Sequence, residues 1–320
     1  MQSLNVVRPG MLTTVQDLGR WGHQSSGVPV AGPMDAYSHV LANRLVGNES
    51  SAAALEITLI GPELTTTADV ICAIAGADFK ATANDVPVPM HRAFTLKSGA
   101  RLRFGDRVAG ARASVAFRGG LAAPPFLGSR STSLTARMGP FGGRALRAGD
   151  VLPLGPADGP GVSAIGSDIG AAAPLPLPRG GATLRVMPGP QQEMFLPQAY
   201  DTLFASRFVV TPASNRMGYR LDGPPLAHAG KSDILSDATP LGAIQVPGSG
   251  QPILLMADRQ TTGGYPKIAT VISADVPIAG QLAPGDWIEF VACTRVAAIA
   301  ALKARYESLD RLVPWESSAR

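Results

Sequence analysis

The hydrophobic positions along the chain fall mostly into short runs that predict β-strands. Apolar residues alternate with polar ones or form brief continuous stretches, and each stretch ends at Gly, Pro, Asn or Asp. The clearest stretches cover residues 55–59, 70–75, 101–104, 114–117, 184–187, 253–256 and 287–291. The pattern therefore predicts a mainly β fold with a few helices.

Helical spacing of the hydrophobic positions is clear in two segments. Pro33 precedes a run at residues 34–46 that stops at Gly47, and proline favours the first turn of a helix while glycine favours its end. The alanine-rich run at residues 295–312 has helical spacing as well, and a shorter helix is predicted after Pro197. The predicted apolar face of the C-terminal helix consists of Val296, Ile299, Leu302, Tyr306 and Leu309.

The length of the chain, 320 residues, favours two domains, because a single hydrophobic core stops growing below that size. Residues 171–181 contain too many prolines for a central strand and indicate a semi-extended connector. We expect an N-terminal domain at residues 1–170, a C-terminal domain at residues 182–320 that ends in a helix, and a boundary near residues 171–181.

Composition and charge exclude several classes of protein. Hydrophobic residues make up 45% of the chain and charged residues 16%, which is typical of a globular protein. The net charge is +4, but the basic residues are scattered, so nucleic-acid binding is not supported. No apolar run approaches the roughly 20 residues that span a bilayer, and the N-terminus does not resemble a secretory leader. Two cysteines without CxxC spacing agree with a cytoplasmic location.

Common catalytic motifs are missing from the sequence. There is no P-loop, GxSxG elbow, HExxH pair or GxGxxG turn, and the four histidines are dispersed. No metal site is predicted. Any catalytic site has to be assembled from other polar clusters.

The densest polar cluster covers residues 258–267, directly after a predicted strand. A glycine pair lets backbone N–H groups approach a ligand, and the neighbouring hydroxyl, amide, guanidinium and ammonium groups can hold planar oxygens. The chain has only five lysines, and a desolvated lysine can act as an acid, a base or an electrostatic clamp. The cluster consists of Asp258, Arg259, Gln260, Thr261, Thr262, Gly263, Gly264, Tyr265, Pro266 and Lys267. The alternative is a tight hairpin in which Asp258 and Arg259 pair on the rim.

Three further groups are candidates. Residues 214–221 place Arg216 and Arg220 around a glycine turn, where a guanidinium can bind a carboxylate with two hydrogen bonds, or where both arginines simply pair with acidic neighbours. Gln245 precedes a turn and can bind an amide, unless it faces solvent. Near the N-terminus, Gln16, Asp17 and Arg20 either line a cleft or bind their own glycine-rich loop together; the second alternative is the commoner.

Several motifs in order resemble one family. They lie at residues 13–20, 41–48 followed by 55–56, 128–132, 214–221 and 260–267, and the match extends from near residue 5 to about residue 291. The chain resembles the allophanate hydrolase subunit 2 family, which includes the C subunit of 5-oxoprolinase, KipA-type regulators and the carboxyltransferase region of urea carboxylase. The resemblance implies two cyclophilin-like β-barrel domains and a partner of the KipI or allophanate hydrolase subunit 1 type.

The resemblance also implies roles for residues. Lys267 and Asp258 are expected to be catalytic. The expected substrate-binding residues are Arg216, Tyr219, Gln245, Arg259, Gln260, Thr261, Thr262, Gly263, Gly264 and Tyr265. One departure is Asp237 after Ser236, where the family pattern usually has glutamate.

Three functions fit these expectations. The preferred one is the C subunit of an ATP-dependent 5-oxoprolinase, which converts 5-oxoproline to glutamate with partners that include a LamB/YcsF-type subunit. The second is a biotin-dependent carboxyltransferase subunit that acts on urea or a similar amide, and the third is a non-catalytic KipA-type regulator. The sequence shows no biotin carboxylase, biotinyl-lysine domain or ATP-binding loop. We therefore expect no tightly bound cofactor, ATP use by the complex, biotin only under the second function, and an isolated chain that is inactive.

Overall fold

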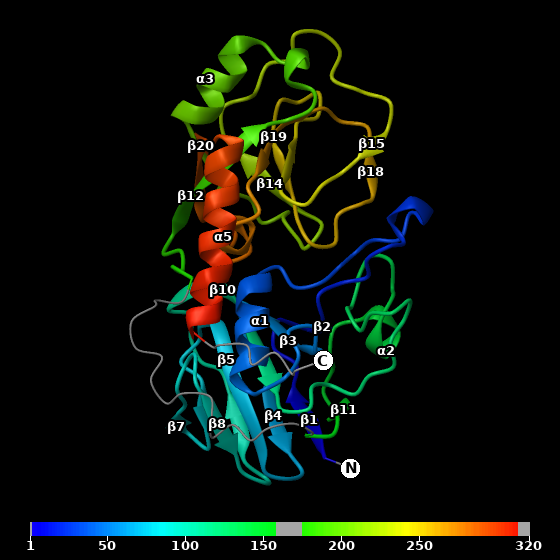
Figure 1. The fold of residues 1–320 in the computed structure, drawn as a ribbon, viewed down its shortest axis with the longest axis vertical. Coiled ribbons are helices and arrows are strands. Elements are labelled where there is room, and N and C mark those ends of the chain that lie inside the picture. Colours follow the sequence, from blue (N-terminus) through cyan, green and yellow to red (C-terminus); the bar gives the residue numbers. More distant parts are fainter. Residues whose placement is uncertain (1, 158–174, 313–320) are drawn as a thin grey trace. The chain divides into compact units, whose positions relative to one another are not determined.

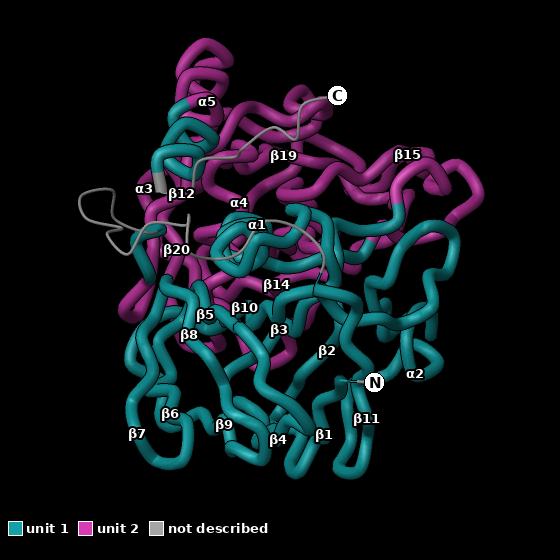
Figure 2. The backbone as a smooth tube through the Cα atoms, turned by 60° about the horizontal axis from the view of Figure 1, so that its bottom comes forward, with its two compact units in different colours: residues 1–20, 31–177, 304–320 teal, residues 21–30, 178–303 magenta. Residues whose placement is uncertain are grey.

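The chain forms two compact units, which we describe separately (Figure 2). A computed structural model describes residues 2–157 and 175–312 (Figure 1). Unit 1 consists of residues 1–20, 31–177 and 304–320, and unit 2 consists of residues 21–30 and 178–303. Along the sequence, the long segments of the two units join at 177/178, and each unit also includes a shorter segment from elsewhere in the chain, 304–320 in unit 1 and 21–30 in unit 2. Part of the predicted connector, residues 171–174, lies outside the described residues, and the division into domains at 1–170 and 182–320 stays a prediction.

Unit 1 contains two antiparallel sheets. The six-stranded sheet has the order β11-β1-β4-β9-β6-β7, and the five-stranded sheet has the order β2-β3-β10-β5-β8. The strands are β1 (Ser3–Arg8), β2 (Leu12–Gln16), β3 (Ala54–Thr58), β4 (Glu63–Thr66), β5 (Val70–Asp78), β6 (Thr82–Ala83), β7 (Val86–Pro87), β8 (Ala93–Leu96), β9 (Arg101–Arg103), β10 (Ala109–Phe117) and β11 (Val151–Pro153). A short helix, α2 (Pro140–Gly143), precedes β11.

The core of unit 1 lies between its sheets and beneath one helix. Every residue of β3 and β10 is buried, which shows that both faces of the five-stranded sheet are covered there. Helix α1 (Ala36–Leu45) contacts β5 and β10 on one face. Leu4, Leu64, Leu102 and Leu152 from the six-stranded sheet belong to the same cluster of buried side chains as Leu55, Ile57, Ile74 and Val115 from the five-stranded sheet.

The helix predicted at residues 34–46 is confirmed as α1, which begins two residues later than expected. Asp35 is the reason, because its carboxylate accepts hydrogen bonds from the backbone N–H of Ser38 at 2.9 Å and from its hydroxyl at 2.6 Å. An aspartate in this position satisfies a free N–H of the first turn and fixes where the helix starts.

His39 on α1 makes the stability of the chain depend on pH. Burial lowers the pKa of His39 from 6.5 to about 4, against an opposing effect of the Asp17 charge. The unfolded state therefore binds the extra proton first, and the free energy of unfolding should fall as the pH drops from 6.5 to about 4. A shift of this size corresponds to about 3 kcal/mol across that range.

Chemical denaturation at a series of pH values checks this expectation. His39→Gln should flatten the slope of unfolding free energy against pH, leaving the contributions of His91, whose pKa is also lowered by burial, and of carboxylates with lowered pKa such as Asp17 at the acid end of the range. Slopes are compared because the substitution also disturbs the 3.2 Å contact between the His39 ring and the Asn43 side-chain amide. Equal slopes for the wild type and the variant would show that His39 does not control this range.

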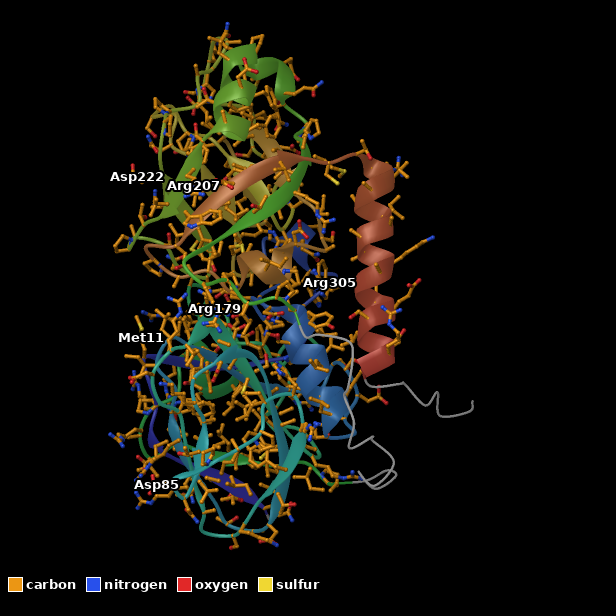
Figure 3. All side chains as sticks on the ribbon, turned by 90° about the vertical axis from the view of Figure 1, so that its left-hand side faces the viewer. Met11, Asp85, Arg179, Arg207, Asp222 and Arg305 are labelled. Atoms are coloured by element: carbon orange, nitrogen blue, oxygen red, sulfur yellow. The ribbon has the colours of Figure 1, made fainter. Side chains whose placement is uncertain are left out.

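Unit 2 is built on a closed seven-stranded barrel with the order β12-β19-β16-β17-β14-β13-β20. The parallel pairing of β20 with β12 closes it. The strands are β12 (Gly181–Pro188), β13 (Arg207–Val210), β14 (Gly218–Asp222), β16 (Ala243–Gln245), β17 (Ile253–Leu255), β19 (Lys267–Val271) and β20 (Trp287–Ala292). A separate two-stranded sheet joins β15 (Asp237–Ala238) to β18 (Thr262–Gly263). The Arg207 guanidinium lies 4.4 Å from the centre of the Trp287 ring. Figure 3 marks the position of Arg207.

Short helices connect the strands of unit 2. Helix α3 (Pro197–Ala205) confirms the helix predicted after Pro197, and α4 (Val276–Ala279) precedes β20. A single turn of 3-10 helix, η3 (Gln192–Met194), lies between β12 and α3, and another, η1 (Gln24–Ser26), lies in the separate segment 21–30 of unit 2.

The predicted C-terminal helix is confirmed as α5 (Arg295–Leu312), but its predicted apolar face is not a core face. Of that face only Leu309 is fully buried, whereas Val296 is 79% exposed and Tyr306 is 60% exposed. Within unit 1 the helix is held by polar contacts, since the Arg44 guanidinium lies 2.6 Å from the Asp310 carboxylate. Helical spacing therefore locates the helix and its apolar side chains, but it does not say which of them are covered.

The described chain is mainly β with five α-helices, as the sequence predicts, and it includes a closed barrel in unit 2. In unit 1 the described strands form two sheets. Among the described residues, none of the helices combines the length and the apolar character needed to cross a bilayer.

Candidate functional site

Residues 256–266 form a crossover between two parallel strands of the barrel. β17 and β19 both pair antiparallel with β16, which lies between them, so they run in the same direction. Gln245 at the end of β16 pairs with Lys267, whereas β17 ends beside Gly242, before the start of β16. The connection therefore passes from one end of β16 to the other. In the polar cluster predicted at 258–267, Asp258 therefore lies near the end of β17 and Lys267 lies at the opposite end of β16.

Lys267 is the centre of the first polar group. It is the first residue of β19 and is only 1% exposed, and its Nζ lies 3.0 Å from Oδ2 of Asp237. The Asp237 side chain is 50% exposed. The hydrogen bond from Lys267 lowers the pKa of Asp237, and the N–H of Ala238 and the charge of Lys267 act in the same direction. The lysine thus has an acidic partner that sequence adjacency did not indicate.

Gln191 completes this group. Its Oε1 accepts a hydrogen bond from the backbone N–H of Lys267 at 3.1 Å, and its Nε2 donates to Oδ2 of Asp237 at 3.4 Å. Gly189 makes this placement possible, because a Cβ there would overlap the carbonyl oxygen of Lys267. The turn after β12 can therefore lie directly against β19 and present the Gln191 amide to the lysine.

A pair of glutamine side chains forms the second polar group. Gln245 is buried; its Oε1 accepts from Nε2 of Gln260 at 3.3 Å, and its Nε2 donates to the Tyr265 carbonyl at 3.3 Å. The Thr239 hydroxyl donates to the Gln260 carbonyl. The possibility that Gln245 faces solvent is therefore wrong. The pair brings amide donors and acceptors next to Gly263, where a missing side chain leaves room for them.

Alanine at Gly263 should destabilise the chain more than alanine at Gly264. A Cβ at Gly263 would lie 2.7 Å from Nε2 of Gln245 and 3.2 Å from Nε2 of Gln260. Moving the amides breaks their hydrogen bond, at a cost of about 1–2 kcal/mol. At Gly264 the nearest atom is the Ile234 carbonyl oxygen at 3.5 Å, an ordinary contact. Guanidinium denaturation of both variants checks the difference, and equal unfolding free energies would contradict it.

Asp258 belongs to a different group from Lys267. Both of its carboxylate oxygens lie 3.1 Å from nitrogens of Arg216, and the two side chains are 1% and 3% exposed. The alternative of a rim pair between Asp258 and Arg259 is therefore wrong, because Arg216 takes that place. The structure does not bring the two predicted catalytic residues together, since Asp258 lies at the start of the crossover and is held in a buried ion pair.

The remaining predicted site residues lie along the crossover or on a strand of the barrel. Nε of Arg259 donates to the Thr239 carbonyl at 2.8 Å, and burial lowers the pKa of Arg259. Tyr219 lies in the barrel interior, where its hydroxyl donates to the Leu282 carbonyl at 3.4 Å. Its role in substrate binding stays a prediction. Along the crossover, Thr261 and Gly264 are half-buried, Thr262 and Tyr265 are exposed, and Pro266 is buried.

The polar cluster near the N-terminus is a structural network. The Asp17 carboxylate accepts hydrogen bonds at 2.6 Å from the hydroxyls of Ser129 and Ser131. Burial alone raises the pKa of Asp17, but these bonds and the N–H groups of Arg130 and Gly19 outweigh it and hold the pKa below its usual range. The structural alternative for this segment is confirmed.

Sequence reasoning did not select Gln191 and Thr239, and it treated Asp237 only as a departure from a family pattern. Each lies outside the predicted cluster at 258–267 and contacts it through the fold. A signal for Gln191 does exist: a Gly-Pro turn follows a predicted strand and is followed by two glutamines. Among residues 2–157 and 175–312, no group of three or more His, Cys, Asp or Glu side chains is arranged to hold a metal ion.

Known proteins share both the sequence and the fold. The family described as carboxyltransferase domain, subdomain A and B, matches residues 26–292. The chain is 37% identical over 309 residues to the C subunit of 5-oxoprolinase from Escherichia coli, and the match covers 97% of each chain. It is also 37% identical to urea amidolyase of Lachancea kluyveri, covering 90% of this chain and 17% of that protein. The crystal structure of the urea amidolyase of K. lactis superimposes with a TM-score of 0.90 at 34% identity, covering 97% of this chain and 20% of that chain.

Proposed function

Because the chain belongs to the carboxyltransferase domain family with subdomains A and B, we propose that it acts as the C subunit of an ATP-dependent 5-oxoprolinase. The observation that carries this proposal is the match to the Escherichia coli protein over 97% of both chains. The chain spans only about a sixth of the urea amidolyase, covering 17% of its length.

The polar groups of unit 2 suit the chemistry of 5-oxoproline. The substrate carries a carboxylate and a ring amide, and its opening breaks the amide C–N bond as water supplies the hydroxyl to carbon and the proton to nitrogen. The buried ammonium of Lys267 suits an anionic oxygen, while the side-chain amides of Gln245 and Gln260 suit an amide. We assign Lys267 the role of binding the substrate carboxylate, which holds the ring amide in place for opening.

The remaining parts of the reaction come from other chains under this proposal. The complex also contains a KipI-type subunit and a LamB/YcsF-type subunit, binds ATP and works in the cytoplasm, while this chain alone is inactive. The names of the bacterial relatives describe them as subunits, which supports an assembly of several chains.

Reconstitution tests the proposal. The chain and the two partner subunits are purified together and assayed for glutamate release from 5-oxoproline with and without ATP. We expect glutamate release that requires ATP and all three chains. An intact complex without ATP-dependent glutamate release would overturn the proposal.

A second function is favoured by the family description and by the superposition on the yeast enzyme. In this function the chain transfers a carboxyl group from carboxylated biotin on a separate carrier to urea or a related amide. Loss of carboxyl from carboxybiotin on addition of urea, in the absence of glutamate release, would favour it. If the chain binds its partner but catalyses neither reaction, the result would favour the regulatory role.

A further inference from the structure

Lys267 and Asp237 are buried to very different extents. The lysine side chain is 1% exposed and the aspartate side chain is 50% exposed. A buried ammonium needs an anion beside it, because its charge has lost the stabilisation of water. A half-exposed carboxylate can return to water at little cost. The cation is thus the fixed member of the pair and the anion is the replaceable one.

The donors around the Asp237 carboxylate are held by rigid parts of unit 2. Lys267 is the first residue of β19 in the closed barrel, and Gln191 is tied to the backbone of the same residue. Lys267 and Gln191 both donate to Oδ2 of Asp237. One donor is a cation and the other is an amide, a combination that selects a carboxylate oxygen. The donors form a small preorganised site.

The segment that carries Asp237 is held more loosely. Asp237 lies in β15, which has two residues and pairs only with β18. Residues 235–238 are exposed, and Leu235 is 94% exposed. Backbone attachments of this segment include the Ile234 N–H, which donates to the Gly264 carbonyl at 2.9 Å. A small rearrangement of a short surface segment is enough to withdraw the aspartate.

We propose that Asp237 is a resident stand-in for the carboxylate of an incoming ligand, and that Lys267 and Gln191 form a carboxylate-binding subsite. In the exchange, the ligand carboxylate accepts from Nζ of Lys267 and Nε2 of Gln191, and the Asp237 carboxylate turns into water. No covalent bond changes. The tethered aspartate competes at an effective concentration on the order of millimolar or more, so it weakens the binding of free carboxylates. The naming of 5-oxoproline as the natural ligand rests on the proposed function, while the subsite itself does not.

The test uses the full chain and acetate as the probe. Asp237→Ala should lower the unfolding temperature, because Lys267 loses its counter-ion, and acetate should restore much of the loss. Acetate should bind the variant at least about ten times more tightly than the wild type, since the competing carboxylate is gone. The same titration with sodium chloride at equal ionic strength, and with acetamide, separates carboxylate binding from screening and from amide binding. 5-Oxoproline is then titrated in the same way.

Three further variants complete the design. Asp233→Ala removes an aspartate four positions earlier and should show no added response to acetate. Asp237→Ala with Lys267→Met should lose the response. Asp237→Asn keeps the shape of the side chain and replaces the alanine variant if that variant does not fold. Its acetate affinity, measured by NMR with labelled acetate, should also exceed the acetate affinity of the wild type.

Two outcomes would overturn the proposal. Chloride or acetamide could stabilise Asp237→Ala as well as acetate does, or the wild type and both Asp237 variants could bind acetate equally. The proposed function fails separately: a chain that binds acetate and 5-oxoproline in this way, in a complex that releases no glutamate, keeps the subsite and loses the activity. If the complex releases glutamate but the chain shows no response to carboxylates, the proposed function is kept and the subsite is overturned.

Discussion

Replacing Lys267 with methionine is expected to reduce glutamate release by the assembled complex at least about 100-fold, because loss of one preorganised charged donor typically costs that much. Methionine fills a similar volume without charge, and the partner left behind, Asp237, is half exposed and can be solvated. The chain should therefore stay folded while the rate falls. Steady-state assays of the reconstituted complex give the rate, and thermal unfolding of the chain gives the stability.

The pKa of Asp237 provides a second measurement on the same variant. The hydrogen bond from Lys267 is the largest cause of its lowered pKa, so in Lys267→Met that pKa should return towards the ordinary value. NMR titration of the side-chain carboxyl detects this shift. Lys231→Met is the matched control, since it removes an exposed lysine from the same surface segment. If the Lys267→Met complex keeps half of the wild-type rate, Lys267 does not take part in the reaction.

Replacing Arg216 with methionine should cost about 3–5 kcal/mol of stability, since breaking a buried ion pair leaves an uncompensated charge. Arg216 and Asp258 are both almost fully buried and share two hydrogen bonds of 3.1 Å. Arg216→Met with Asp258→Leu should recover much of this loss, because no charge is then left in the interior. Guanidinium denaturation followed by tryptophan fluorescence measures the effect, since Trp21 and Trp287, two of the three tryptophans, belong to unit 2.

The same variants separate a structural role of Asp258 from a catalytic one. Arg220→Met is the control, because it removes an exposed arginine four positions away and should change stability by less than about 0.5 kcal/mol. If the double variant regains stability and the complex regains glutamate release, Asp258 acts through the fold alone. A stable double variant whose complex is inactive would restore Asp258 to the catalytic residues.

The strands and helices that the sequence analysis names were predictable because each depends on a local pattern. Alternating apolar residues ended by glycine or proline mark the strands, and helical spacing at residues 34–46 marks α1, whose first residue is set by Asp35. The burial of α5 was not predictable in the same way. Its alanines and apolar residues satisfy helical spacing, but only neighbouring elements decide which face is covered, and Val296 remains exposed.

The candidate site was predictable in composition and not in arrangement. Lys267 and Asp258 are nine positions apart in sequence, yet the crossover from β17 to β19 carries them to different ends of β16. The partners of Lys267 are 30 and 76 positions away, at Asp237 and Gln191. Those contacts depend on the register of the barrel strands and on the close approach of Gly189 to the backbone of Lys267. No local sequence motif predicts either of them.

The closed barrel limits how another protein can recognise unit 2. All seven barrel strands have neighbours on both sides, so none offers free backbone groups to an added strand. Among the described strands of unit 2, only β15 and β18 have an open side, and β15 carries Asp237, the partner of Lys267. A partner that binds by sheet extension would therefore have to pair with β15 or β18, which contain Asp237 and Gly263. Its binding would change the surroundings of the Asp237 carboxylate that Lys267 contacts.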